Sequence, residues 1–364
     1  MPVSSEYSKA GIDYDVLDES KRAAIRNAEA TSGLIAAHGG RVIEESRGAS
    51  AFVLELGGQQ LAFVVEGLGT KSILARQWLE QTGEDRFADV GIDGVAAIVN
   101  DVASVGALPV VVNAYFATGS SEWHAQGGSA INLLEGWRTG CERAQAVWGG
   151  GESPALPDLV SPKDVEIAGS SIGTVPSEWG PLLGDDLASG QAIVLVGSSG
   201  LHANGATLAR TVATRLPDGL RTRMPDGGPF GAALLEPSVI YVPLVAELRN
   251  RGIKPSYFAH VTGHGLRKLM RAPAELTYVI DELPPVLAFL AEEAGMSEHD
   301  AYGTFNMGAG WAVYVEPGDA ESVVDAAAAV GMRAHVAGHL EEGERAVELA
   351  EKGIAYRSDE LELG

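Results

Sequence analysis

The sequence contains almost no cysteine and no excess of basic residues, and both shortages restrict what the protein can do. Cys141 is the one cysteine among 364 residues, which excludes an internal disulfide framework. The 49 acidic and 26 basic residues give a net charge of −23, whereas nucleic-acid binding requires a basic surface. No apolar run reaches the length of about 18 residues that a membrane span needs, and the N-terminus lacks a signal-peptide layout. We therefore expect a cytoplasmic protein with no nucleic-acid or membrane partner.

Several catalytic signatures are also absent. The sequence has no GxSxG nucleophile elbow and no HExxH motif, so serine hydrolysis and zinc proteolysis have no support. His260 and His264 lie four residues apart, but the glycines and the threonine around them indicate a loop, and we discount a zinc site there. In a chain this acidic, an anionic substrate must be held by local groups or by metal ions.

Glycine, by contrast, is abundant, and many of the 46 glycines form clusters that suggest close approach to backbone or ligand. Strands and helices mix in two halves, which predicts two α/β or α+β domains, residues 1–180 and 181–364. The turn-rich stretch 176–190 marks the boundary. We expect helices at 20–38, 72–81, 91–109, 129–147, 231–249, 284–295 and 319–330, and strands at 51–56, 61–67, 110–119, 165–175, 191–199, 276–280, 307–317 and 332–337.

The stretch 91–109 organises the N-terminal half and is typical of an apolar helix with polar interruptions. Asp93 and Asn100 are seven residues apart, close to two turns, so they share a face about 10 Å apart along the axis. They could hold two parts of one extended ligand, such as a metal ion and a phosphate tail. The alternative is an N-cap role for Asp93 and an Asn100–Asp101 pair that is hydrogen-bonded to neighbouring loops.

The segment 66–71, EGLGTK, lies where a strand becomes a helix. Its glycines would let the backbone approach a ligand, and Lys71 with the helix N-terminus would attract phosphate. Glu66 would supply a hard oxygen for Mg²⁺. The spacing matches neither a Walker loop nor a dinucleotide fingerprint, and a strained turn with a surface lysine is the alternative.

Three further loops carry polar residues next to glycine. We expect 149–153 to end the helix before it, with Glu152 as the residue that suggests more than a C-cap. His202 and Asn204 would stand at the carboxyl end of a strand, where His202 could contact phosphate or transfer a proton. An asparagine cap with an exposed histidine is the alternative there. The loop 259–265 is a third turn before a helix.

The order of these segments resembles aminoimidazole ribonucleotide synthetase, the phosphoribosylformylglycinamidine cyclo-ligase family. The matching segments are YSKAGIDYD (7–15), EGLGTK (66–71), GIDGVAAIVNDVASVGALPV (91–110), YFATG (115–119), GGES (150–153), VEIAGSSIGTV (165–175), GSSGLHANGATLAR (197–210), LLEPSVIYV (234–242), AHVTGHGL (259–266) and TFNMGAGWAVYV (304–315). They span most of residues 7–315.

The resemblance implies a two-domain fold, a homodimer in which N-terminal sheets pair, and ATP with Mg²⁺ as cofactors. It also implies conversion of formylglycinamidine ribonucleotide to aminoimidazole ribonucleotide in purine biosynthesis, with Asp93, Lys71 and His202 as catalytic residues. The expected metal ligands are Glu66, Asp93 and Asp101. The expected ATP-binding residues are Gly67, Gly69, Thr70, Lys71, Asn100, Gly150, Gly151 and Glu152, and the expected substrate-binding residues are His202, Asn204, Thr262 and Gly263.

This chain departs from the family pattern at its ligand loops. Glu66 stands where the family usually has aspartate, Ala155 replaces a second glutamate, and His264 replaces a glycine. The family's glycine-rich loop is rewritten as ESRGASAFV at 45–53. Two alternatives therefore stay open: an ATP-dependent kinase or synthetase of the same fold acting on another small metabolite, and a non-catalytic ATP-binding dimeric module.

Overall fold

The structure, a computed structural model, describes residues 23–125, 127–272, 275–278 and 284–361. The expected N-terminal arm, including YSKAGIDYD at 7–15, lies outside the described residues. Within the described part of the chain, no helix is both long enough and apolar enough to cross a membrane.

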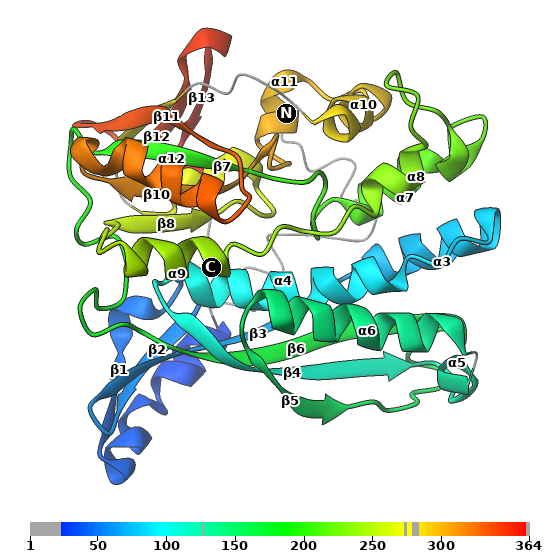
Figure 1. Ribbon diagram of the computed structural model, residues 1–364, viewed down its shortest axis with the longest axis horizontal. Helices are drawn as coiled ribbons and strands as arrows, with labels where there is room; N and C mark the ends of the chain where they lie inside the picture. Colours follow the sequence, from blue (N-terminus) through cyan, green and yellow to red (C-terminus); the bar gives the residue numbers. More distant parts are fainter. Residues whose placement is uncertain (1–22, 126, 273–274, 279–283, 362–364) are drawn as a thin grey trace.

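A six-stranded sheet forms the N-terminal half, in the order β1-β2-β3-β6-β4-β5. The strands are β1 (Gly40–Ile43), β2 (Phe52–Leu56), β3 (Gln59–Gly67), β4 (Leu108–Thr118), β5 (Val147–Glu152) and β6 (Val165–Thr174). The helices α3 (Lys71–Thr82), α4 (Phe87–Ser104) and α6 (Gly128–Arg143) cover one face of this sheet (Figure 1). The described residues place no long helix on the other face, which we call the bare face. The short helices of this half are η1 (Ser32–His38), η2 (Glu44–Ser46) and α5 (Glu122–Ala125).

Glycine lets α4 and α6 pack unusually close together. A Cβ atom on Gly136 would lie 1.9 Å from the carbonyl oxygen of Ala88, and one on Gly91 would lie 2.5 Å from the carbonyl oxygen of Leu133. Any larger side chain would push the helices apart. The close packing holds α4, which carries Asp93, Asn100 and Asp101, firmly against the sheet.

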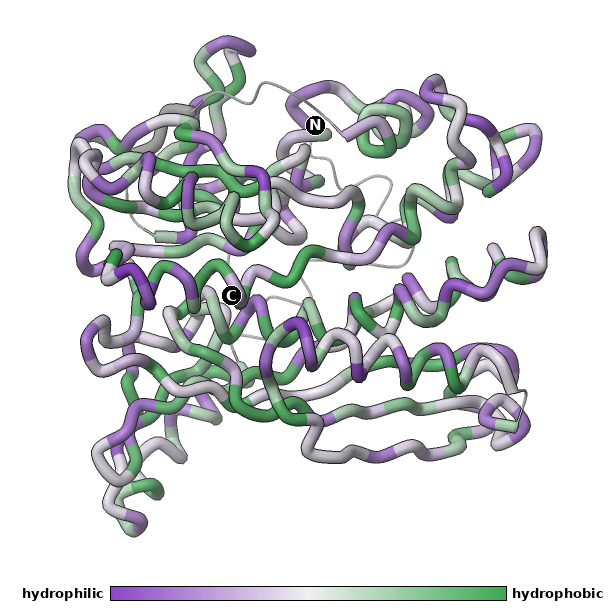
Figure 2. The backbone as a smooth tube through the Cα atoms, in the orientation of Figure 1, coloured by the Kyte–Doolittle hydropathy of each residue, from purple (hydrophilic) through white to green (hydrophobic). Residues whose placement is uncertain are grey.

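A seven-stranded sheet forms the C-terminal half, in the order β13-β12-β9-β11-β7-β10-β8. Its strands are β7 (Ala192–Gly197), β8 (Tyr257–His260), β9 (Glu275–Tyr278), β10 (Ala309–Val315), β11 (Ala334–Glu341), β12 (Ala346–Leu349) and β13 (Ile354–Arg357). Its helices are α7 (Ala206–Ala213), η3 (Gly219–Arg221), α8 (Phe230–Leu234), α9 (Val242–Asn250), η4 (Gly265–Arg271), α10 (Pro285–Glu293), α11 (Glu298–Tyr302), η5 (Pro317–Asp319), α12 (Ala320–Ala329), η6 (Ala350–Lys352) and η7 (Ser358–Glu360). Figure 2 shows hydrophobic stretches along the central strands of this sheet.

The structure corrects three expectations about the helices and strands. The expected helix 231–249 is two helices, α8 and α9, joined by an extended segment, residues 235–241, which we call the strap. The helix expected at 129–147 ends at Arg143, and 147–152 is the edge strand β5 rather than a helix-ending turn. Asp93 lies well inside α4, which begins at Phe87, so an N-cap role for it is wrong.

Candidate active site

The main cavity lies between the two halves and has a volume of about 260 Å³. Residues from both sheets and from the loops that follow their strands contribute to its wall. They are Ala49, Ser50, Glu66, Gly67, Leu68, Ala96, Ala97, Asn100, Asp101, His202, Ala203, Asn204, Ser238, His260, Thr262, Lys268 and Arg271. Predicted residues from four separate segments of the sequence therefore meet at one site.

Two carboxylates form an acidic wall of this cavity. Glu66 lies at the end of β3 and Asp101 in the last two turns of α4. Burial and then the negative charge of Asp101 raise the pKa of Glu66 to about 7. Asp101 is held from the other half of the molecule, because its Oδ1 lies 2.6 Å from Nδ1 of His260. The acidic wall is thus a place where a cation would relieve electrostatic repulsion.

The donor set suits Mg²⁺ bound together with a phosphate. Among the described residues, no group of three or more His, Cys, Asp or Glu side chains is placed to hold a metal ion unaided. Mg²⁺ typically takes one or two protein carboxylates and completes its shell with waters and substrate phosphate oxygens. Glu66 and Asp101 supply that number, and the pKa of Glu66 stays raised although the positive charges of Lys268 and Arg271 act to lower it.

Lys71 and Asp93 do not line the cavity, and the roles expected for them stay predictions. Lys71 Nζ is 2.7 Å from Asp93 Oδ2, and both side chains have no exposed surface. Asp93 Oδ1 also accepts hydrogen bonds from the backbone N–H, at 2.9 Å, and the hydroxyl of Ser238. Lys71 donates to the carbonyl oxygen of Glu236 at 3.1 Å. The pair therefore fastens the strap to α3 and α4.

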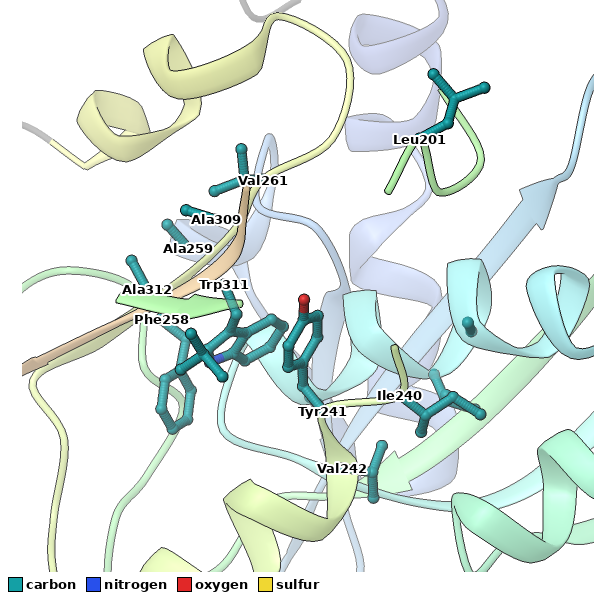
Figure 3. Packing of buried hydrophobic residues seen from close by; sticks show 14 of the residues in the cluster. Leu201, Ile240, Tyr241, Val242, Phe258, Ala259, Val261, Ala309, Trp311 and Ala312 are labelled. Atoms are coloured by element: carbon teal, nitrogen blue, oxygen red, sulfur yellow. The ribbon is translucent and has the colours of Figure 1, made fainter. Parts of the chain in front are cut away.

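Asn100 fastens the strap at a second point. Its amide donates to the carbonyl oxygen of Val239 and accepts from the N–H of Tyr241, both at 2.9 Å. Tyr241 stacks on Trp311 with ring centroids 5.2 Å apart, as Figure 3 shows. Asp93 and Asn100, predicted to hold two parts of one extended ligand, both bind the strap, and their contact with a ligand stays a prediction.

His202 faces the cavity as a neutral imidazole. Its Nε2 accepts from the backbone N–H groups of Ser199 and Val239, at 3.2 and 3.5 Å, so the ring proton belongs on Nδ1. Burial, with the positive charges of Lys71 and His260, lowers the pKa of His202 to about 3. His202 can donate a hydrogen bond to a ligand near neutral pH, but it is not an imidazolium acid.

The remaining predicted site residues divide into two groups. Gly67, Asn204 and Thr262 line the cavity. Six others do not line it: Gly69, Thr70, Gly150, Gly151, Glu152 and Gly263. Gly150, Gly151 and Glu152 lie exposed on β5. The roles of this second group stay predictions.

Sequence reasoning missed His260, Ser238, Lys268 and Arg271 as cavity residues. His260 was considered only as a zinc ligand. Lys268 and Arg271 belong to η4, immediately behind the loop 259–265, and two basic residues beside a predicted ligand loop were the available signal in so acidic a chain. Ser238 carried no such signal, because the strap was expected to be helical.

The two sheets and the cavity between them define the class of AIR synthase related proteins. The model of the N-terminal domain of these proteins matches residues 48–175, and the model of the C-terminal domain matches 188–349. The phosphoribosylformylglycinamidine cyclo-ligase of Lachnospira eligens is 33% identical over 291 residues, covering 78% of this chain and 82% of that protein. The same enzyme of Bacillus velezensis is 32% identical over 355 residues, covering 94% and 97%. The chain belongs to the phosphoribosylformylglycinamidine cyclo-ligase family, as the resemblance predicted.

A solved structure supports the fold independently. The hydrogenase maturation protein HypE in complex with ATP superposes with a TM-score of 0.55 at 16% identity, covering 81% of this chain and 83% of that one. At this identity the likeness shows the fold alone.

Proposed function

We propose that this protein is an ATP-dependent cyclo-ligase that converts formylglycinamidine ribonucleotide to aminoimidazole ribonucleotide in purine biosynthesis. The observation that carries the proposal is the cavity that unites the carboxylates Glu66 and Asp101 with neutral and cationic donors from the other half of the chain. A reaction that joins a metal-bound nucleotide to a phosphorylated substrate needs both kinds of group within one site.

The reaction has two steps. The γ-phosphoryl group of ATP passes to the amide oxygen of the substrate and leaves ADP. The neighbouring amidine nitrogen then attacks the activated carbon, the C–O bond to phosphate breaks, and the imidazole ring closes with loss of a proton. Mg²⁺, when bound, offsets charge on the transferring phosphoryl group.

The residues of this chain would divide these tasks by position. Glu66 and Asp101 would hold Mg²⁺ and thereby place the nucleotide at the acidic wall. His202, Asn204 and Thr262 would hold the substrate on the opposite side through hydrogen bonds. Fixing both reacting groups of one substrate supplies much of the rate of a ring closure. A small-molecule activity of this kind and a single buried thiol fit the reducing cytoplasm.

The direct test incubates the purified protein with ATP, Mg²⁺ and formylglycinamidine ribonucleotide. We expect equal amounts of ADP, phosphate and an imidazole product, and rescue of a purine auxotroph that lacks this enzyme. ADP release with other phosphorylated metabolites, but none with this substrate, would favour a kinase or synthetase of different specificity. Mg-ATP binding without turnover on any substrate would favour the non-catalytic module.

We also propose a homodimer that covers the bare face of the N-terminal sheet. Phe63, Val65, Val110 and Ile172 are between 40% and 65% exposed, and all four lie on β3, β4 and β6. Phe63 and Ile172 are directly paired across neighbouring strands. Aligned apolar side chains of this kind mark an interaction surface, and a second copy presents a matching one.

Replacing Ile172 with aspartate should therefore convert the protein from dimer to monomer, because the charge would be buried in the interface. Light scattering after gel filtration gives the mass directly. Val336→Asp is the matched control, since Val336 is 42% exposed but lies on β11 of the other sheet. A monomeric parent protein, or an Ile172→Asp variant that stays dimeric, would overturn this assignment.

A further inference from the structure

A second cavity adjoins the first and carries an unusual concentration of arginine. It has a volume of about 280 Å³ and shares Ala49, Ser50 and Arg271 with the main cavity. The other residues of its wall are Glu45, Arg47, Gly48, Ser104, Val105, Leu182, Leu183, Tyr257, Arg345 and Leu361. We call it the arginine cavity. The shared residues Ala49, Ser50 and Arg271 place the two cavities next to each other.

Neither Arg271 nor Arg345 forms an ion pair with a described residue, although the charge of Arg271 acts on Glu66. Arg271 donates to the carbonyl oxygen of Gly48, at 2.6 and 3.2 Å, and to the hydroxyl of Ser50 at 2.7 Å. Arg345 donates to the carbonyl oxygens of Met270, at 2.7 Å, and of Arg271, at 3.1 Å. All these partners are neutral. Arg47, by contrast, is paired with Glu44 at 2.6 Å.

The guanidinium groups of Arg271 and Arg345 line one cavity in a chain whose net charge is −23, which is notable. Arginine keeps its charge in every protein environment, and its planar fork matches a phosphate or a carboxylate. Both charges act on the same spot, because both lower the pKa of buried Tyr257 against the raising effect of burial. Among the described residues of this wall, Glu45 is the single carboxylate, and its side chain is exposed. The local field therefore favours an anion.

We propose that the arginine cavity binds the phosphate group of the phosphorylated substrate through Arg271 and Arg345. The inference rests on the proposed function for the identity of the ligand, a ribose phosphate. It gives the substrate a direction: its phosphate lies at the arginines, and its reacting end reaches past the loop 48–50 to His202 and the acidic wall. The rewritten segment 45–53 is then the floor of a phosphate site, fastened by Arg271.

Arg345→Met keeps an apolar stem but removes both the charge and the hydrogen bonds to Met270 and Arg271, so it is compared with Arg345→Lys, which keeps the charge. The probe is ribose 5-phosphate, with inorganic phosphate beside it, titrated calorimetrically into the dimeric protein without nucleotide. We expect the variant to bind ribose 5-phosphate about 10- to 100-fold more weakly, the usual effect of losing a charged hydrogen-bond donor. Mg-ATP affinity should stay unchanged, and Arg345→Lys should recover part of the loss.

Arg249→Met is the matched control, since Arg249 lies 44% exposed on α9, pairs with Glu178, and lines neither cavity. Unchanged ribose 5-phosphate binding in a folded Arg345→Met protein would overturn the proposal, and so would a loss confined to Mg-ATP. If the parent protein binds ribose 5-phosphate through Arg345 but forms no imidazole product, the proposed function fails and the phosphate site stands. If Arg345→Met forms the imidazole product with the same KM for formylglycinamidine ribonucleotide as the parent protein, the phosphate site fails and the proposed function stands.

Discussion

Replacing Lys71 with methionine is expected to lower the free energy of unfolding by about 3 to 5 kcal/mol, the largest stability effect that we predict for a single substitution. The reason is the charge left behind. Asp93 has no exposed surface, and its Oδ2 is 2.7 Å from Lys71 Nζ. Without the ammonium group, a carboxylate stays buried with Ser238 as its remaining hydrogen-bond partner among the described residues. Chemical denaturation of parent and variant measures the difference.

A double variant tests the physical cause. Lys71→Met with Asp93→Asn removes both charges and keeps an oxygen that can accept from the N–H of Ser238. We expect it to recover most of the lost stability, because the main cost lies in the unpaired charge and not in the absent contact. Arg138→Met is the control: it breaks a pair with Glu142 that is about 60% exposed on α6, and it should cost under about 1 kcal/mol.

The pH dependence of the single variant has a definite sign. Burial already raises the pKa of Asp93, and Lys71 opposes that rise. Loss of Lys71 raises the pKa of the folded form further above that of the unfolded chain. Stability is then greatest at low pH, where Asp93 is protonated in both states, and falls as pH rises through the folded pKa. The gap between parent and variant should therefore widen with rising pH. A gap that narrows, or a stable Lys71→Met protein with weakened Mg-ATP binding, would support the phosphate role for Lys71.

The fold was largely predictable from the sequence, because apolar periodicity and glycine turns mark local structure directly. The hairpin of β2 and β3 and the helices α3, α4 and α12 lie close to where the pattern placed them. The strap was missed. Pro237 in its middle disfavours a helix, and this signal was overlooked. Tertiary contacts also hold the strap, because Asp93, Asn100 and Lys71 bind its backbone groups.

The sequence predicted which residues line the candidate site better than what each of them does there. A polar residue in an apolar helix signals a partner, and the sequence does not say whether that partner is a ligand or another segment of the chain. Asp101 faces the cavity, whereas Asp93, two turns earlier on the same helix, faces the strap. Arg345 could not be found at all, because it follows the matching segments by some thirty residues and reaches the site through the last strands of the sheet.

Asp101→Asn is expected to lower kcat/KM of the proposed reaction about 1,000-fold, the loss of roughly 4 kcal/mol of transition-state stabilisation that follows from the proposed metal-binding role of this carboxylate. The substitution is nearly isosteric, and the asparagine oxygen can still accept from Nδ1 of His260. The melting temperature should therefore change little. Asp325→Asn on the exposed face of α12 is the control for any general effect of removing a negative charge.

Metal binding, measured without turnover, is the second readout for Asp101→Asn. It depends on pH, because Glu66 must lose its proton before it can hold a cation. With its pKa raised to about 7 by burial and by Asp101, Glu66 is partly protonated near neutral pH. In the parent protein, Mn²⁺ affinity measured with ADP present should therefore rise as pH increases from about 6 to about 8. In Asp101→Asn the repulsion between the two carboxylates is gone, so the pKa of Glu66 falls. The rise of Mn²⁺ affinity with pH then shifts to lower pH. The Mn²⁺ affinity itself drops, because one carboxylate ligand is lost. An Asp101→Asn protein with the parent's Mn²⁺ affinity and pH profile would show that the acidic wall does not hold the metal.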